Sequence, residues 1–333
     1  MMEERKIAVL GAGSWGTALA ISLAKNGRNV CLWGRNSSAI EEMRRTGENS
    51  RYLPGAAIGP GVSFTDDAKD ALDGAEAAVY VVPAQAFRSC LEETRAYLGN
   101  GIPVINCSKG IERGTHLRIS QIAEQVDPKL RFAVLSGPSH AEEVAKGLPT
   151  TLIAASRDMG TASYVQDLFM SDSMRVYTSL DVIGTELGGA LKNIIALCAG
   201  ISDGMGYGDN AKAALMTRGL REMARLGVEM GADRNTFMGL SGVGDLIVTC
   251  TSMHSRNRRC GIMIGEGTDP EEATEKVGMV VEGMYTTEAA YELAALHGVE
   301  MPITEQLYRV IRKETTASEA VRILMGREKK HED

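Results

Sequence analysis

The sequence lacks the patterns that mark metal proteins, disulfide-rich proteins and membrane proteins. Its six cysteines form no Cys-x-x-Cys pair, and its five histidines form no His-Glu-x-x-His motif, so we expect reduced cysteines and no metal site. No uninterrupted apolar run reaches the length of a bilayer span, and the N-terminus lacks the apolar core of a signal peptide. We therefore expect a cytoplasmic protein without stable membrane insertion.

Basic residues are also fewer than acidic ones. The chain has 36 Lys and Arg against 43 Asp and Glu, for a net charge of −7. A general nucleic-acid binder normally carries a basic face, so we expect a small-molecule substrate and no nucleic-acid partner. At 333 residues, the chain is long enough for two domains, each with its own core.

The most informative stretch that the sequence does contain is residues 6–20. An apolar run leads into Gly11-x-Gly13-x-x-Gly16, and a helix-forming run follows. In a dinucleotide-binding turn, Gly11 would permit the tight turn, Gly13 would let the backbone approach a pyrophosphate, and Gly16 would let the helix pack closely. The free N–H groups of that helix would face the phosphates. The stretch predicts a nicotinamide or flavin dinucleotide fold; a Rossmann-like fold with another ligand is the alternative.

Hydrophobic patterning divides the chain into two parts. Up to residue 180, short β-branched runs alternate with helical patterns, which indicates βαβ units. The expected strands are 6–10, 30–33, 78–82, 103–107, 132–136, 150–155 and 174–177, and the expected helices between them are 15–26, 37–46, 84–98, 115–125 and 140–146. Beyond residue 180, helical periodicity dominates, and the expected helical stretches are 183–230, 256–265, 284–297 and 302–325. We predict an α/β protein: a Rossmann-type doubly wound parallel sheet over residues 1–180, followed by an all-α C-terminal substrate-binding and catalytic domain over residues 181–333.

The end of the second expected strand bears on the choice of nucleotide. NAD-specific sites place an acidic residue there to bind the ribose. This chain has Gly34-Arg35-Asn36 instead, and Arg35 would offer a cation to a 2′-phosphate. We predict NADPH as the cofactor, with NADH also accepted; the alternative is that Arg35 is an ordinary exposed arginine. The next segment, 47–61, has two prolines and four glycines and predicts a long loop over the sheet edge.

Two lysines are candidates for catalysis. Lys109 follows the strand 103–107, at the edge where α/β sheets bind ligands. Lys192 follows Gly188 and Gly189 in a helical pattern, where two glycines indicate the close approach of a backbone or ligand. A lysine there either extends to solvent or is partly buried with a lowered pKa. In the second case it would pass a proton at neutral pH, as reduction of a ketone requires.

A polar block follows in the second half of the chain. Asp245 and Thr249 are four residues apart, so they share a face if that turn is helical. Ser255 at a helix start, with Arg256 and the free backbone N–H groups, would make a phosphate site. The alternative is a basic helix start with ordinary surface arginines.

Together these segments closely resemble the bacterial type of NAD(P)-dependent glycerol-3-phosphate dehydrogenase, over roughly residues 6 to 325. The blocks that carry the resemblance are Gly11-Ala-Gly-Ser-Trp-Gly-Thr-Ala-Leu-Ala, Arg51-Tyr-Leu-Pro-Gly, Ser108-Lys-Gly-Ile-Glu, Leu135-Ser-Gly-Pro-Ser, Ala190-Leu-Lys-Asn-Ile, Gly244-Asp-Leu, Thr249-Cys-Thr-Ser, Ser255-Arg-Asn-Arg and Val280-Val-Glu-Gly. The resemblance implies reduction of dihydroxyacetone phosphate to sn-glycerol 3-phosphate for phospholipid synthesis, in a cleft between the two domains. Because helix-rich second domains of such reductases often self-associate, we expect a homodimer.

The resemblance also implies roles for individual residues. The catalytic set would be Lys192, as general acid/base at the C2 oxygen, with Lys109, Asp245 and Thr249. The substrate-binding residues would be Lys109, Gly137, Ser139, Lys192, Asn193, Asp245, Ser255, Arg256 and Asn257. The cofactor-binding residues would be Gly11, Gly13, Ser14, Trp15, Gly16, Arg35, Lys109, Ala141, Arg256, Val280 and Glu282. Some relatives carry a second basic residue where this chain has Asn36, which leaves a strict preference for NADPH over NADH open.

Two other interpretations stay open on sequence alone. A related Rossmann-plus-helical-domain reductase of a 2-ketoacid or sugar acid would share the glycine pattern and a lysine. It would not be expected to combine Thr249-Cys-Thr-Ser with Ser255-Arg-Asn-Arg. A non-catalytic nucleotide sensor would need the glycine pattern but no set of lysine, aspartate and arginine.

Overall fold

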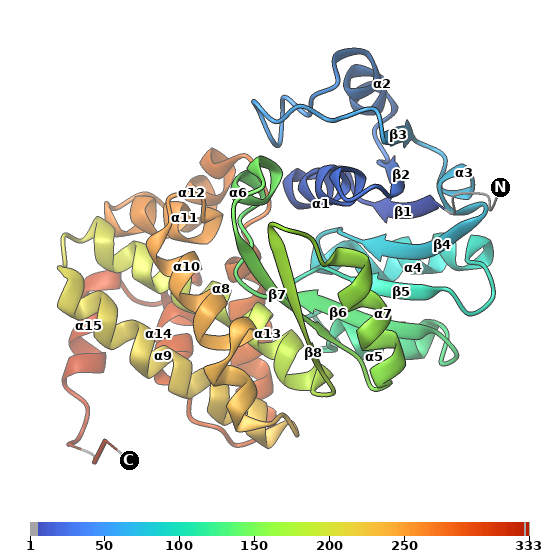
Figure 1. The fold of residues 1–333 in the computed structure, drawn as a ribbon. Helices are drawn as coiled ribbons and strands as arrows, with labels where there is room; N and C mark the ends of the chain where they lie inside the picture. Colours follow the sequence, from blue (N-terminus) through green and yellow to red (C-terminus); the bar gives the residue numbers. More distant parts are fainter. Residues whose placement is uncertain (1–5, 330, 333) are drawn as a thin grey trace.

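A computed structural model describes residues 6–329 and 331–332, and over this range it contains one eight-stranded sheet beside a group of helices (Figure 1). The strands are β1 (Lys6–Leu10), β2 (Asn29–Trp33), β3 (Val62–Thr65), β4 (Ala75–Tyr80), β5 (Pro103–Asn106), β6 (Arg131–Ser136), β7 (Thr150–Ala155) and β8 (Met174–Ser179). Their order across the sheet is β3-β2-β1-β4-β5-β6-β7-β8. The chain reverses direction across the sheet between β1 and β4, and the carboxyl ends of the strands at such a point form a ligand crevice.

The strands are apolar on both faces, so both faces must be covered. In β1, Ile7 and Val9 are buried in the core on one face, and Ala8 and Leu10 in the core on the other. The first face is covered by α1 (Ser14–Lys25), α2 (Ser37–Thr46), α6 (Ala141–Lys146) and α7 (Met159–Phe169). The second is covered by α3 (Ala68–Leu72), α4 (Phe87–Thr94) and α5 (Ile119–Val126), with 3₁₀ turns at Ala84–Ala86 and Arg95–Tyr97 on either side of α4. This is the predicted doubly wound arrangement.

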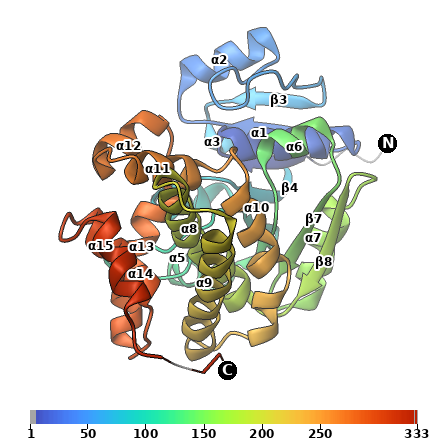
Figure 2. The ribbon, with the colours of Figure 1, turned by 90° about the vertical axis from the view of Figure 1, so that its left-hand side faces the viewer.

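The second half of the chain packs around α8 (Val182–Gly204). Figure 2 shows this helical half facing the viewer. Its other elements are α9 (Asp209–Glu229), a 3₁₀ turn (Arg234–Met238), a π-helical turn (Leu240–Gly244), α10 (Asp245–Thr251), α11 (Arg256–Gly265), α12 (Pro270–Val277), α13 (Glu282–Leu296), α14 (Pro302–Ile311) and α15 (Ala317–Met325). Beyond β8 the described residues form no further strand, as the sequence predicts.

Helix α8 is long and apolar enough to span a membrane by length and composition, and it is the one such helix in the described part of the chain. Glu186 and Lys192 interrupt its apolar run, but its mean hydropathy over 18 residues still reaches 1.3. Of that window, 89% is buried inside the protein. The helix is therefore the centre of the second hydrophobic core, and other helices surround it.

Helices α8 and α11 pack backbone against backbone. A Cβ atom at Gly200 would lie 2.1 Å from the carbonyl oxygen of Arg258, and one at Gly261 would lie 2.1 Å from that of Leu197. Only glycine permits so close an approach. The contact holds the start of α11 at a set position relative to α8, and these two helices carry Lys192, Arg256 and Asn257.

The sheet differs from the prediction in one pairing. The prediction of a parallel sheet is wrong at β7, which runs antiparallel to β6. With six residues, α6 is too short to carry the chain back along the sheet, so β7 starts at the edge where β6 ends. Helix α7, which the sequence did not predict, then returns the chain and lets β8 run parallel to β7.

Several short elements were also missed. They are β3, α3 and α12, whose few residues produce no clear periodicity. Two long helical stretches are each divided: 183–230 into α8 and α9, and 302–325 into α14 and α15. The segment 47–61 is a loop without helix or strand, with a single bridge between Glu48 and Ala57, as predicted.

Candidate active site

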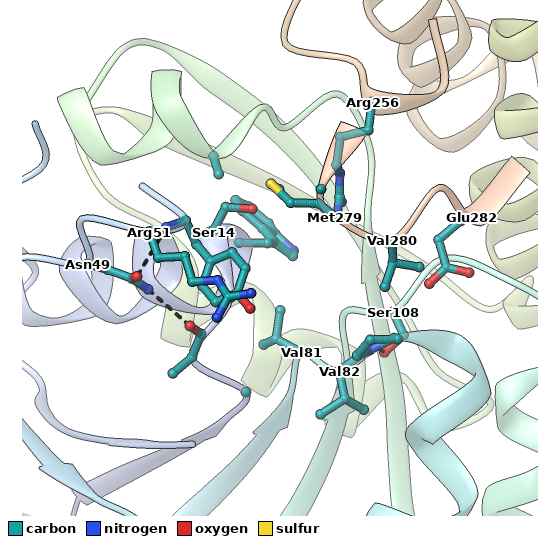
Figure 3. A pocket seen from close by; sticks show the side chains of 18 of the residues that line it. Ser14, Asn49, Arg51, Val81, Val82, Ser108, Arg256, Met279, Val280 and Glu282 are labelled. Atoms are coloured by element: carbon teal, nitrogen blue, oxygen red, sulfur yellow. Dashed lines mark hydrogen bonds between the residues drawn. The ribbon is translucent and has the colours of Figure 1, made fainter. Parts of the chain in front are cut away.

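A cavity of about 1230 Å³ lies between the carboxyl ends of the strands and the helical half. Figure 3 shows side chains from both halves of the chain around it. Its lining comes from residues 11–15, 33–36, 48–52, 81–83, 107–109, 139–142, 192–193, 254–257 and 278–282, together with further single residues. The two parts of the chain therefore share one site, and most of the predicted residues line it.

The glycine turn has the geometry that its sequence indicates. Gly11 has a φ of +127°, and a Cβ atom there would lie 2.3 Å from the carbonyl oxygen of Val81. A Cβ atom at Gly16 would lie 1.8 Å from the carbonyl oxygen of Gly11. At Gly13, by contrast, a Cβ atom would meet nothing within 4 Å. Gly11 and Gly16 are thus required by packing, whereas Gly13 keeps open space at the start of α1.

This contrast gives a matched pair of substitutions. Gly16→Ala is expected to lower both stability and dinucleotide affinity, because the new methyl group displaces α1 at a cost of about 2 kcal/mol or more. Gly13→Ala is expected to leave the melting temperature nearly unchanged but to weaken dinucleotide binding, because the methyl group fills the space that a pyrophosphate would occupy. Thermal denaturation and titration with NADPH measure the two effects. Equal behaviour of the two variants would contradict the assignment.

Lys192, Asp245 and Thr249 form the buried centre of the site. Lys192 Nζ, on α8, donates to Asp245 Oδ1 at 2.5 Å and to Thr249 Oγ1 at 2.7 Å. The Thr249 hydroxyl donates to the carbonyl oxygen of Asp245 at 2.6 Å, one helical turn back. Asp245 is the first residue of α10, directly after the π-helical turn Leu240–Gly244. Asp245 and Thr249 therefore do share one helical face.

Lys109 reaches the same carboxylate from the other half of the chain. Its Nζ donates to Asp245 Oδ2 at 2.7 Å, to the carbonyl oxygen of Gly137 at 2.9 Å and to Ser139 Oγ at 3.3 Å. An ammonium group has three N–H donors, so all those of Lys109 are engaged. Lys192 uses two of its three donors and keeps one for a ligand. Asp245 thus bridges two lysines, of which Lys192 has an N–H left for a ligand and Lys109 has none.

Burial and charge set the ionisation of this cluster. Burial lowers the pKa of Lys192 to about 8; the Asp245 carboxylate opposes that shift, and the nearby charge of Lys109 adds to it. Burial alone would raise the pKa of Asp245, but the two ammonium groups outweigh it and hold that pKa below its usual range. At neutral pH the cluster therefore contains a charged carboxylate and a lysine close to its titration point.

The start of α11 forms a second polar centre. Ser255 is the N-cap of the helix, and its Oγ accepts from the N–H of Arg258 at 3.2 Å. Figure 3 shows the Arg256 side chain at the cavity, and burial lowers the pKa of its guanidinium. Arg256 makes no ion pair with any described residue. A cation beside the N-terminus of a helix is the combination that binds phosphate.

The Asn257 side chain lines the cavity and also holds neighbouring elements together. Its side chain donates to Asn193 Oδ1 at 2.9 Å and accepts from the N–H of Gly283 at 2.8 Å. Asn257 and Asn193 thus tie α11, α8 and the start of α13 together. These bonds use one of the two hydrogens on Asn257 Nδ2, so the second hydrogen and the backbone N–H at the helix start remain to meet a ligand.

The predicted cofactor residues line the cavity, and some of them fit a polar ligand. These residues are Gly11, Gly13, Ser14, Trp15, Arg35, Lys109, Ala141, Arg256, Val280 and Glu282. Glu282 Oε1 accepts from the N–H of Ala84 at 3.1 Å, while Glu282 Oε2 and Trp15 Nε1 are buried without a partner among the described residues. Such unpaired buried polar atoms in the cavity lining suit a polar ligand such as a dinucleotide. Gly16 lies behind the turn and outside the lining.

The Arg35 side chain is paired with a carboxylate, which the sequence did not indicate. Its guanidinium forms an ion pair with Glu93 at 2.9 Å, and both side chains are more than half exposed. Asn36 caps α2, accepting from the N–H of Ala39. Asn49, which is 4% exposed, is among the lining residues that were not predicted from the sequence. A single asparagine in a predicted loop follows no pattern that could have revealed it.

Comparison with known proteins identifies the family. Residues 6–162 match the family described as NAD-dependent glycerol-3-phosphate dehydrogenase N-terminus, and residues 181–322 match its C-terminus. The chain belongs to the NAD-dependent glycerol-3-phosphate dehydrogenase family. The predicted family, fold class and enzyme class, an NAD(P)-dependent oxidoreductase, are confirmed.

Relatives in this family align with nearly the whole chain. Glycerol-3-phosphate dehydrogenase (NAD(P)+) of Geobacillus kaustophilus is 56% identical over 98% of this chain and 96% of the relative. The enzyme of the same name from Clostridium perfringens is 52% identical over 98% of this chain and 99% of the relative. The crystal structure of glycerol-3-phosphate dehydrogenase from Coxiella burnetii superposes with a TM-score of 0.93, at 40% identity, over 97% of this chain and 99% of that chain.

A more distant likeness concerns the fold alone. A ketopantoate reductase family protein from Ralstonia eutropha superposes over 95% of this chain and 99% of that chain, with a TM-score of 0.60 at 15% identity. The architecture of a Rossmann sheet with a helical partner is thus common to both families. The choice between the main interpretation and the 2-ketoacid alternative rests on sequence identity, which supports the glycerol-3-phosphate dehydrogenases.

Proposed function

We propose that the chain reduces dihydroxyacetone phosphate to sn-glycerol 3-phosphate, with NADPH as the cofactor and NADH also accepted, and that the product serves phospholipid synthesis. The observation that carries this proposal is the pair of polar centres in one cavity. One is the Lys192–Asp245–Lys109 cluster, suited to a ketone oxygen, and the other is the Arg256 helix start, suited to a phosphate. A phosphorylated ketone carries both groups.

In this mechanism, the phosphate and the carbonyl group of the substrate are held by different parts of the site. Arg256 and the backbone N–H groups of the α11 start bind the phosphate, with Ser255 and Asn257 fixing that helix start. Their binding energy aligns the carbonyl carbon, which is remote from the phosphate. Gly137 and Ser139 hold Lys109 at the cavity wall. Asn193, on α8, accepts a hydrogen bond from Asn257, on α11, and so holds the two helices together.

Lys192 acts as the acid in the reduction. When bound, the reduced nicotinamide supplies the hydride. Negative charge then develops on the C2 oxygen, and the unengaged N–H of Lys192 donates its proton to that oxygen. Lys109, fully engaged by its three acceptors, stays a fixed cation that stabilises the developing charge. Asp245 and Thr249 hold the Lys192 ammonium in place.

The pKa of Lys192 predicts opposite pH profiles for the two directions. Reduction requires the protonated lysine, so kcat for dihydroxyacetone phosphate is expected to fall as the pH rises through about 8. Oxidation of glycerol 3-phosphate requires the neutral lysine, so kcat in that direction is expected to rise over the same range. Initial rates at constant ionic strength between pH 6 and pH 10 measure both limbs. Parallel profiles in the two directions would contradict the assignment.

Arg256→Ala is expected to raise KM for dihydroxyacetone phosphate by about 100-fold, because a charge-assisted contact to the phosphate is lost. A smaller fall in kcat would accompany it through poorer alignment. Arg258→Ala is the matched control, because Arg258 is bound by Asp203 at 2.7 Å and contributes to packing. This control should lower stability and leave KM within about twofold. An unchanged KM in Arg256→Ala would contradict the assignment of a phosphate site to the start of α11.

Steady-state kinetics with dihydroxyacetone phosphate and each nucleotide test the function and the cofactor preference together. We expect turnover with both nucleotides and a higher kcat/KM with NADPH. Arg35→Gln is expected to reduce that preference, since Arg35 is the cation at the end of β2. Nucleotide binding without turnover would instead favour a sensor.

We further propose a division of work between residues 1–180, for the dinucleotide, and residues 181–333, for substrate and catalysis, in a cytoplasmic homodimer. The division is supported by Lys192, Asp245 and Arg256, which all follow residue 180, while residues 1–180 contribute Lys109 to the same site. Light scattering coupled to size-exclusion chromatography tests the homodimer. A mass of one chain at micromolar concentration would contradict it.

A further inference from the structure

The loop 47–61 places an arginine over the cofactor side of the cavity. Figure 3 shows the Arg51 side chain extending into the cavity beside Ser14. Its guanidinium lies 5.1 Å from the ring centre of Tyr52, and it forms no ion pair with a carboxylate of any described residue. Arg35, the arginine that the sequence singles out, is instead paired with Glu93. Arg51 is therefore the less restrained of the two cations.

A buried asparagine attaches this loop to the glycine turn. Asn49 Nδ2 donates to the carbonyl oxygen of Ala12 at 3.0 Å and to Thr17 Oγ1 at 2.8 Å. Ala12 lies between Gly11 and Gly13, and Thr17 lies in the first turn of α1. Both hydrogens of the amide are thus used on the element that would hold the pyrophosphate.

The same asparagine also shapes the loop itself. Asn49 Oδ1 accepts from the N–H of Tyr52 at 3.3 Å, and its carbonyl oxygen accepts from the N–H of Leu53 at 2.8 Å. Leu53 is 1% exposed and belongs to the core beneath α1. Arg51 is two residues from Asn49, so their Cα atoms are at most about 7 Å apart. The backbone of Arg51 is therefore held close to the start of α1.

From these contacts we propose that Arg51 binds the pyrophosphate of the dinucleotide, and that Asn49 is the positioning residue that holds Arg51 over the turn. The inference rests on the proposed function, since it requires a dinucleotide in this cavity. The start of α1 has no side-chain cap, because Gly13 occupies the N-cap position, so its N–H groups would meet the phosphates from one side. Arg51 would meet them from the other.

The pyrophosphate is common to NADH and NADPH, which makes the assignment testable by binding alone. Arg51→Gln is expected to raise the dissociation constants of both nucleotides by the same factor, about tenfold. Arg51→Lys, which keeps the charge, should lose less affinity. Arg45→Gln removes an exposed arginine outside the cavity lining and is the matched control. Isothermal titration calorimetry supplies the constants without catalysis.

The role of Asn49 is tested by a double-mutant cycle. Asn49→Ala is expected to raise both dissociation constants about as much as Arg51→Gln does, and the double variant to show no further loss. A merely structural asparagine would give additive losses. Trypsin provides a second readout, because it cleaves after Arg51. In Asn49→Ala the Arg51–Tyr52 bond is expected to be cut several times faster than in the wild type, and Arg45→Gln should leave that rate unchanged.

The outcomes separate this inference from the proposed function. Loss of NADPH affinity alone in Arg51→Gln would overturn the pyrophosphate assignment in favour of the 2′-phosphate. Unchanged affinity for both nucleotides would overturn any role for Arg51, and additive losses with an unchanged rate of cleavage would overturn the role of Asn49. Failure of the wild-type chain to bind either nucleotide would refute the proposed function itself.

Discussion

Lys192→Ala is expected to lower kcat for reduction of dihydroxyacetone phosphate by about 10³-fold or more, because the general acid is removed and all three N–H donors of the neighbouring Lys109 are engaged. The dissociation constant of NADPH should stay within about twofold, since the ammonium group lies against Asp245 and Thr249 and outside the glycine turn. Stopped-flow measurement of NADPH oxidation and a separate binding titration measure the two quantities.

Two further variants of lysine make this expectation specific. Lys192→Arg keeps a positive charge, but the pKa of a guanidinium is far above that of Lys192, so the variant should also fail to donate a proton efficiently. Lys129→Ala replaces an exposed lysine in the turn between α5 and β6, far from the cavity lining, and should behave as the wild type. Near-normal kcat in Lys192→Ala would show that another group, or water, supplies the proton.

Asp245→Asn is expected to be almost as damaging, for an electrostatic reason. The substitution keeps the shape of the side chain but removes the charge that Lys109 and Lys192 share at 2.7 and 2.5 Å. Without that charge the pKa of Lys192 falls further, so less of the acid is protonated at pH 7. We expect kcat at pH 7 to fall by about 100-fold, and the falling limb of the reduction profile to move below pH 8.

The same substitution should lower stability, because two ammonium groups lose their carboxylate at a buried position, at a cost of about 3 kcal/mol. Asp203→Asn is the matched control. Asp203 also binds two cations, Arg258 and Lys212, both at 2.7 Å, but neither of these cations lines the cavity, whereas Lys109 and Lys192 do. It should lower the melting temperature and leave the pH profile in place. A profile that moves in both variants, or in neither, would disprove the role given to Asp245.

Local features of the site could be predicted from the sequence because they depend on neighbours along the chain. Gly188 and Gly189 in a helical pattern indicated the close approach of a backbone or ligand to that helix, and Cβ atoms there would lie 2.4 Å from the carbonyl oxygen of Ser241 and 2.9 Å from Ser136 Oγ. The spacing of Asp245 and Thr249 likewise gave their shared helical face. Such patterns need only the geometry of one helix.

Tertiary partners could not be predicted in this way. Asp245 joins two lysines that are 136 and 53 residues away in the sequence, and no spacing rule indicates such a bridge. The ion pair of Arg35 with Glu93 crosses 58 residues and depends on how α4 lies against β2. Strand β7 and the short helix α6 before it were predicted, but the antiparallel direction of β7 was missed, because hydrophobic periodicity does not indicate strand direction.

The most direct test of the proposed function compares two substrates at pH 7. The initial rate of NADPH oxidation is measured with dihydroxyacetone phosphate and with ketopantoate. Ketopantoate is a 2-ketoacid, and a ketopantoate reductase family protein shares this fold. A site made of a Lys192–Asp245–Lys109 cluster and an Arg256 phosphate centre predicts rapid oxidation with dihydroxyacetone phosphate and negligible oxidation with ketopantoate. Comparable or faster oxidation with ketopantoate would contradict it.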